Sequence, residues 1–173
     1  MPTVSLSFPA SVWAPPDDTT SWNSAQLQIK QSSASVPSPR WVEWLFDDTT
    51  DEHIVTTLFI PGDFVSVPSL YVYYKMASAT SSSVRWAAQI HALTHNDSVD
   101  LDADAFATEA AASGVVPATA GHIRVTRILF LTNDDGIAAQ DYVTLVLRRD
   151  PDHADDGASG DAEFIGADFR YEV

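Results

Sequence analysis

The chain contains no cysteine, so neither disulfide bonds nor thiolate metal sites contribute to its fold or chemistry. It is also poor in positive charge, with nine Lys and Arg against 24 Asp and Glu in 173 residues, a net charge of −15. Contacts with nucleic-acid phosphates and with anionic membranes need clustered basic residues, so we expect neither partner. No apolar run approaches the roughly 20 residues of a spanning helix. No basic segment followed by an apolar one opens the chain, so we expect no cleaved leader.

The sequence also lacks the short motifs that mark common catalytic sites. There is no Gly-x-Ser-x-Gly nucleophile turn and no glycine-rich loop to hold a phosphate group. Four acids gather in residues 47–52. Glycosidases, however, hold two carboxyl groups about 5 to 9.5 Å apart across a cleft, and neighbours in one loop seldom achieve this. We therefore predict that the chain is not an enzyme and has no catalytic residue.

One acidic run has the start of a calcium-binding loop without its later positions. Asp100, Asp102 and Asp104 alternate as the first ligands of such a loop do. The sixth position, however, is Ala105 in place of glycine, and the twelfth is Ala111 in place of a bidentate glutamate. We predict no metal site and no cofactor.

What the sequence does contain is alternation of apolar and polar residues with a period of two, the pattern of strands with one buried face. It is clearest in residues 70–77 and 84–93. Residues 97–113 are rich in alanine and aspartate, and we expect an irregular segment there with at most one helical turn. We predict an all-β, antiparallel β-sandwich with jelly-roll topology and about eight strands. The predicted strands are residues 25–30, 40–46, 54–60, 70–77, 84–93, 123–132, 141–150 and 162–173.

Alternation also predicts which side chains face the core and which segments stay outside it. The loop at residues 150–160 contains four aspartates, so we expect it to be exposed and mobile. Replacing Asp155 and Asp156 should then cost under about 0.5 kcal/mol. The predicted core is Trp44, Val72, Tyr74, Trp86, Ile90, Val125, Val143, Leu145, Leu147, Ile165 and Phe169.

Four aromatic residues are candidates for binding a partner. Trp13 and Trp22 lie in residues 1–24, which we expect to form an N-terminal arm before a sandwich domain at residues 25–173. They either fold back on this chain's own core or pack on a neighbouring subunit. Tyr71 and Tyr73 share one face of a strand, which is either covered or open for stacking on sugar rings.

Several segments between Trp41 and Tyr171 resemble a family of small virion proteins that recurs in tailed double-stranded DNA phages. In that family glycine usually stands where this chain has Gln140. The resemblance implies a jelly-roll-like module on the particle surface. The matching segments are residues 44–53, 60–64, 73–86, 100–106, 138–150 and 160–164.

From this resemblance we expect a non-enzymatic structural protein on the virion exterior, most simply a capsid decoration or cement protein, or a head fibre. Its partner would be the major capsid protein or another virion protein, and the chain would act as a homo-oligomer, most simply a homotrimer. The alternative is a carbohydrate- or receptor-binding module of a tail fibre. A cluster of exposed Tyr or Trp on one sheet favours that alternative.

Overall fold

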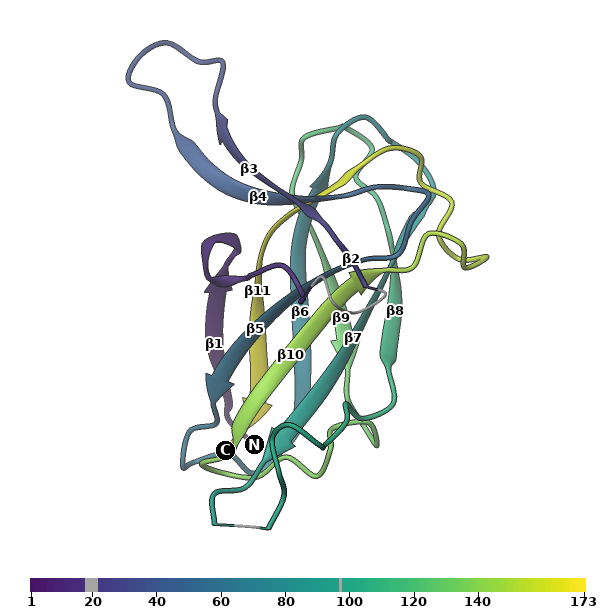
Figure 1. Ribbon diagram of the computed structural model, residues 1–173. Helices are drawn as coiled ribbons and strands as arrows, with labels where there is room; N and C mark the ends of the chain where they lie inside the picture. The colour runs from purple at the N-terminus through teal and green to yellow at the C-terminus, as the bar shows by residue number, and fades with distance from the viewer. Residues whose placement is uncertain (18–21, 97) are drawn as a thin grey trace.

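Two β-sheets stacked face to face make up the fold in the computed structural model, which describes residues 1–17, 22–96 and 98–173 (Figure 1). Sheet A has the order β3 (Gln26–Gln31), β4 (Arg40–Phe46), β11 (Ala162–Glu172), β6 (Ser66–Met76) and β9 (Arg124–Leu129), with β1 (Thr3–Pro9) also paired to β11. Sheet B has the order β2 (Asn23–Ser24), β5 (Glu52–Phe59), β10 (Tyr142–Arg149), β7 (Ser83–Leu93) and β8 (Ala110–Val115). Within the described residues, no helix has the length and apolarity needed to cross a membrane.

The strand order is that of a jelly roll. Of the eight strands from β4 to β11, sheet A takes the first, eighth, third and sixth, and sheet B takes the second, seventh, fourth and fifth. This order follows when two Greek keys wrap across both sheets. The predicted all-β sandwich with jelly-roll topology is confirmed.

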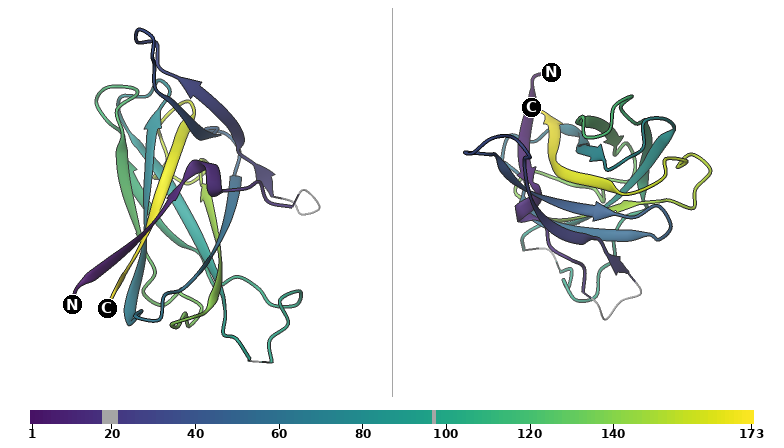
Figure 2. Two further views of the ribbon diagram at one scale, coloured as in Figure 1. Left: turned by 90° about the vertical axis from the view of Figure 1, so that its left-hand side faces the viewer. Right: turned by 90° about the horizontal axis from the view of Figure 1, so that it is seen from above.

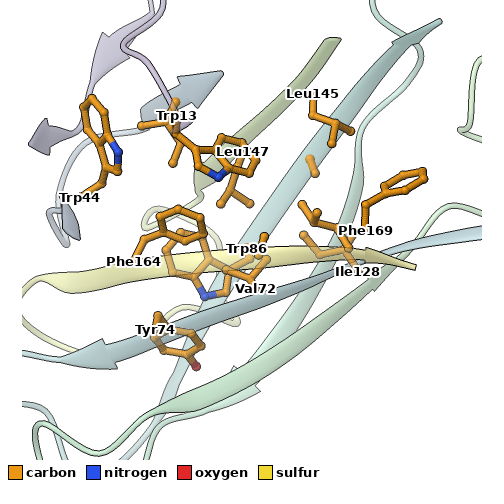
Figure 3. Close-up of a cluster of buried hydrophobic side chains, with 14 of the residues drawn as sticks. Trp13, Trp44, Val72, Tyr74, Trp86, Ile128, Leu145, Leu147, Phe164 and Phe169 are labelled. Carbon is orange, nitrogen blue, oxygen red and sulfur yellow. The ribbon is translucent and has the colours of Figure 1, made fainter. Parts of the chain in front are cut away.

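Aromatic rings fill the space between the sheets (Figure 3). Trp86 is fully buried, and its ring meets those of Phe46 and Tyr74 edge to face, with centroids 5.0 and 5.3 Å away. Edge-to-face pairs add to the free energy gained from burying apolar area. The predicted core is confirmed at Trp44, Val72, Tyr74, Trp86, Ile90, Val143, Leu145, Leu147 and Phe169.

Two predicted core residues, Ile165 and Val125, instead point outward from sheet A. In β11 the register with β6 slips by one residue between Phe164 and Gly166, so Ile165 is the extra residue of a β-bulge and is only half-buried. Such a bulge reverses the alternation beyond it, which strict counting misses. In β9, both alternating sets contain apolar residues. Ile128 takes the buried side, and Val125 is left 43% exposed.

The segment predicted to be irregular ends in a strand. β8 begins at Ala110 and pairs with β7, although its residues are mostly Ala, Ser and Gly. These residue types have weak strand propensity, so here the pairing with β7 decides the conformation. The prediction was wrong for residues 110–113.

The N-terminal residues are built into the sandwich. β1 pairs with β11 over seven residues, and the two strands lie side by side (Figure 2). Trp13 is 4% exposed and packs edge to face on Phe164 at 5.3 Å. The indole Nε1 of Trp44 donates to the carbonyl of Ala10 at 2.9 Å. Of the two alternatives for Trp13, the structure therefore has the one in which it folds onto its own core.

The loop at residues 150–160 is held in place by a buried arginine. Arg149 is fully buried and donates through Nε and Nη2 to the carboxylate of Asp156 at 3.0 and 2.8 Å. Its guanidinium also donates to the carbonyls of Phe46, Ala158 and Gly160. The Asp156 side chain is 2% exposed, so the predicted exposure of this carboxylate is wrong. A loop rich in aspartate is here the partner that a buried arginine needs.

Glu52, at the start of β5, is expected to make stability depend on pH. Burial raises the pKa of Glu52 from 4.5 to about 7, and the nearby charges of Asp47 and Asp161 act in the same direction. The folded state therefore keeps this proton where the unfolded state has lost it. The stabilisation is complete below pH 4.5 and is lost as the pH rises through about 7.

We expect Glu52→Gln to be more stable than the native chain at pH 8 by about 1–2 kcal/mol, after allowance for solvent screening at a half-buried site. At pH 4 the two proteins should be equal. Glutamine still offers an oxygen to the amide of Asp47, which Glu52 accepts at 2.8 Å. Urea unfolding at both pH values measures the difference, with Asp152→Asn on the exposed loop as the control for loss of a charge. An advantage of the same size at pH 4 would contradict this assignment.

Candidate functional site

The chain itself covers part of the outer face of sheet B, although Phe59 on that face is exposed. Trp22 stacks on His53, with centroids 4.8 Å apart and planes 7° from parallel. Phe106, from the segment between β7 and β8, contacts both Trp22 and His91 with centroids 5.8 Å away. Gln89 donates to the carbonyl of Ala107 at 3.1 Å and fastens that segment to the sheet.

The outer face of sheet A, which we call the A face, carries partly exposed aromatic side chains instead. Trp41 points outward from β4, and Tyr71 and Tyr73 point outward from β6. Both tyrosines were predicted as binding residues, and the structure places them together on this face. Of the predicted tryptophans, Trp13 lies in the core and Trp22 on sheet B, so neither contributes to the A face.

Three hollows follow β6 along the A face, and we call them together the A-face groove. The first, of about 660 Å³, is lined by Trp41 and Lys75 and by residues of the β3–β4 hairpin, which rises beyond the sandwich (Figure 1). The second, of about 280 Å³, is lined by Tyr73 and Asp168 and shares Ile123 and Ile165 with the first. The third, of about 190 Å³, is lined by Tyr71, Arg127 and Arg170, together with Thr3, Val67, Ser69, Tyr171 and Glu172.

A cluster of charges holds the first hollow in shape. The ammonium of Lys75 lies 3.0 Å from Glu43 Oε2 and also contacts Glu163. The indole Nε1 of Trp41 donates to the same Glu43 oxygen at 2.6 Å. Lys75 Nζ lies 5.8 Å from the centre of the Trp41 ring. Because Glu43 is fully buried, this arrangement fixes the orientation of Trp41 before any ligand arrives.

The second hollow has a fixed polar wall centred on Asp168. Its carboxylate accepts from Ser7 at 2.7 Å, from the Tyr73 hydroxyl at 2.9 Å and from Arg170 Nη2 at 2.8 Å. Partial burial alone would raise the pKa of Asp168, but these hydrogen bonds hold it below its ordinary value, so the group is ionised. Burial and the bond to Asp168 raise the pKa of Tyr73, so its hydroxyl stays a donor.

Sequence reasoning missed several residues of the groove. Trp41 and Trp44 are three residues apart in one strand, so alternation puts them on opposite faces, and Trp44 was the one assigned to the core. That spacing alone was enough to find Trp41. Asp168 and Arg170 carried no such signal, because their outward direction depends on the bulge at Ile165.

Two other features have less to offer a ligand. Asp51, Asp150 and Asp152 lie close enough to share a cation, but the guanidinium of Arg148 already lies 2.6 Å from Asp51 and 3.3 Å from Asp150. A hollow of about 460 Å³ lies between β1 and β5, and its lining contains no charged side chain. Of these three features, the acidic cluster, the hollow between β1 and β5 and the A face, it is the A face that combines aromatic rings with fixed polar groups.

No protein-family model matches the chain, and no curated protein does. Several solved structures are similar to the chain in the path of the backbone. They include the α-L-arabinofuranosidase MgGH51 with bound arabinose (12% identity, TM-score 0.49, 95% of this chain and 24% of that one). TmCBM61 in complex with β-1,4-galactotriose matches at 11% identity and TM-score 0.46, over 95% and 91%. A family 11 carbohydrate-binding module from Clostridium thermocellum, with a β-1,3-1,4-mixed-linked tetrasaccharide, matches at 10% and 0.45, over 91% and 88%. This chain spans about a quarter of the arabinofuranosidase, and likeness at this level concerns the path of the chain alone.

Proposed function

We propose that this chain is a non-enzymatic module that binds carbohydrate along the A-face groove. The observation that carries the proposal is the row of partly exposed rings, Trp41, Tyr73 and Tyr71, on the outer face of one sheet. The chain's own segments cover part of the opposite sheet, whereas the A face keeps all three of these rings partly exposed beside its hollows.

Sugars suit this surface because each ring has an apolar C–H side and a rim of hydroxyl groups. Aromatic side chains pack on the apolar side, and a few fixed donors and acceptors orient the rim. Asp168 and Lys75 are held by their neighbours in the free protein, so binding loses little side-chain entropy. Two glutamates behind the first hollow, Glu43 and Glu163, both face Lys75, which gives them a structural task.

The predicted place on a virion remains a prediction, as do the capsid partner and the trimer. A carbohydrate-binding module corresponds to the alternative expected from the sequence, a carbohydrate- or receptor-binding module of a tail fibre. A cluster of exposed Tyr or Trp on one sheet favours that alternative. The A face supplies that feature through Trp41 and the two tyrosines.

Binding to an array of plant, algal and bacterial glycans tests the proposal, followed by titration calorimetry on the best ligand. We expect Trp41→Ala and Tyr73→Ala to weaken binding by at least about tenfold, as loss of a central aromatic contact does. Phe59→Ala is the matched control, because Phe59 is 71% exposed on sheet B. Circular dichroism confirms that each variant is folded. Absence of binding across the array, or binding that neither groove variant weakens, would refute the proposal.

A further inference from the structure

We infer that the third hollow, around Tyr71, Arg127 and Arg170, recognises an anionic group on the bound glycan, a carboxylate or a sulfate. This inference rests on the proposed function, since it concerns one end of the same groove. It adds the class of sugar, an acidic one, and the residues that select it.

The first observation is an arginine without an acid. Arg127 is in no ion pair within residues 1–17, 22–96 and 98–173, and its guanidinium carbon lies 5.7 Å from the centre of the Tyr71 ring. The chain has 24 acidic and nine basic side chains, so acidic partners are in excess. An arginine on an open face that is in no ion pair with a described residue is therefore unusual in this chain. Six of the nine bases do have acidic partners, namely Lys30, Lys75, Arg85, Arg148, Arg149 and Arg170.

The second observation is a donor without an acceptor. Arg170 stacks on the other flank of the hollow, 3.9 Å from the centre of the Tyr71 ring. Its Nη2 donates to Asp168 and to the Tyr73 hydroxyl, but its Nε is buried and has no acceptor among the described residues. A buried donor left unpaired destabilises the free protein, and a ligand oxygen that reached it would relieve that cost.

Guanidinium groups suit this task, because their planar array of N–H donors matches the paired oxygens of a carboxylate or a sulfate. Stacking on Tyr71 holds both groups in place; Arg170 is also paired with Asp168, whereas Arg127 is in no ion pair with a described residue. The hollow, of about 190 Å³, is the last of the three along β6, so an anion bound there would belong to one end of a bound glycan.

The charge balance permits an anion here despite the net charge of −15. Glu172 also lines the hollow, where its carboxylate accepts from Ser66 at 3.4 Å, so two arginines face two carboxylates there, Glu172 and Asp168, and the local charge is balanced. Asp168 beside it is already paired with Arg170. The excess acid of the chain lies elsewhere, and its repulsion is screened over about 8 Å at physiological ionic strength.

The test compares acidic glycans with neutral glycans of the same backbone by titration calorimetry. Polygalacturonate and its methyl ester form the carboxylate arm, and a sulfated galactan and its desulfated form make the sulfate arm. In at least one arm we expect the acidic member to bind the native chain at least about tenfold more tightly, and added salt to reduce the difference. The arm that shows the preference identifies the anion.

Arg127→Gln should abolish that preference and leave binding of the neutral member unchanged. Arg124→Gln is the matched control, since it removes the same charge from the same strand outside the three hollows. Equal affinity in both arms, or a loss in Arg127→Gln that also affects the neutral glycan, overturns the inference. In those cases Trp41→Ala still weakens neutral binding and the proposed function stands. If neither member of any pair binds, the inference fails, and the glycan array alone decides on the proposed function.

Discussion

Asp156→Ala is expected to lower the free energy of unfolding by about 3–5 kcal/mol, because it leaves the guanidinium of Arg149 buried without its anion. Arg149 is fully buried and Asp156 is 2% exposed, so water cannot replace the lost partner. The carboxylate also accepts the amide of Arg85 at 2.9 Å, and this bond is lost as well. Urea unfolding followed by tryptophan fluorescence measures the change.

Asp155→Ala is the control for this prediction. Its side chain is 61% exposed and lies 3.5 Å from Arg85, so we expect a change under about 0.5 kcal/mol. The two adjacent aspartates, similar in the sequence, should therefore differ severalfold in their contribution to stability. A cost for Asp156→Ala as small as that of Asp155→Ala would show that Arg149 does not depend on this ion pair.

Trp13→Ala should destabilise the fold by about 3–5 kcal/mol, the usual cost of removing a large aromatic side chain from a core. Trp13 is 4% exposed and packs against Phe164, so its loss opens a cavity at one edge of the sandwich. Trp22→Ala is the matched control, since Trp22 lies on the outer face of sheet B, against His53. We expect it to cost about 1–2 kcal/mol, and equal costs would contradict the assignment of Trp13 to the core.

Removal of residues 1–24 is expected to go further and prevent stable folding. It deletes β1, which pairs with β11 over seven residues, as well as Trp13. Loss of partner binding in a chain without residues 1–24 would therefore follow from loss of the fold, and it would not identify these residues as a contact with another protein. Point changes on the A face leave the core intact and are the sharper probe.

Sequence patterns predicted the bounds of a strand closely where one face of that strand is buried along its whole length. β4 was predicted at residues 40–46 and runs over Arg40–Phe46. β8 was missed because its small residues have little preference of their own, and only pairing with β7 makes them a strand. The burial of Asp156 was missed for a related reason. An aspartate-rich loop is normally solvated, and only the fold brings Arg149 beneath it.

The sequence predicted some residues of the candidate site and missed others. Tyr71 and Tyr73 were found because two residues on one strand with a spacing of two must share a face. The arginines around them were not, since Tyr71 meets Arg127 through the pairing of β6 with β9, and Arg170 through the pairing with β11. Register between distant strands is a property of the whole fold, which no short pattern contains.

The bulge in β11 consists of one extra residue, Ile165, so the deletion of a single codon would remove it. Deleting Ile165 would restore even alternation along the strand and, in the same step, remove one of the two side chains shared by the first two hollows. Phe164 and Ala167 already face inward on either side, so the core would keep its composition. In a strand without a bulge, the same deletion would turn every later side chain to the wrong face. An insertion or deletion at this one position therefore changes the lining of the A-face groove while conserving the sandwich.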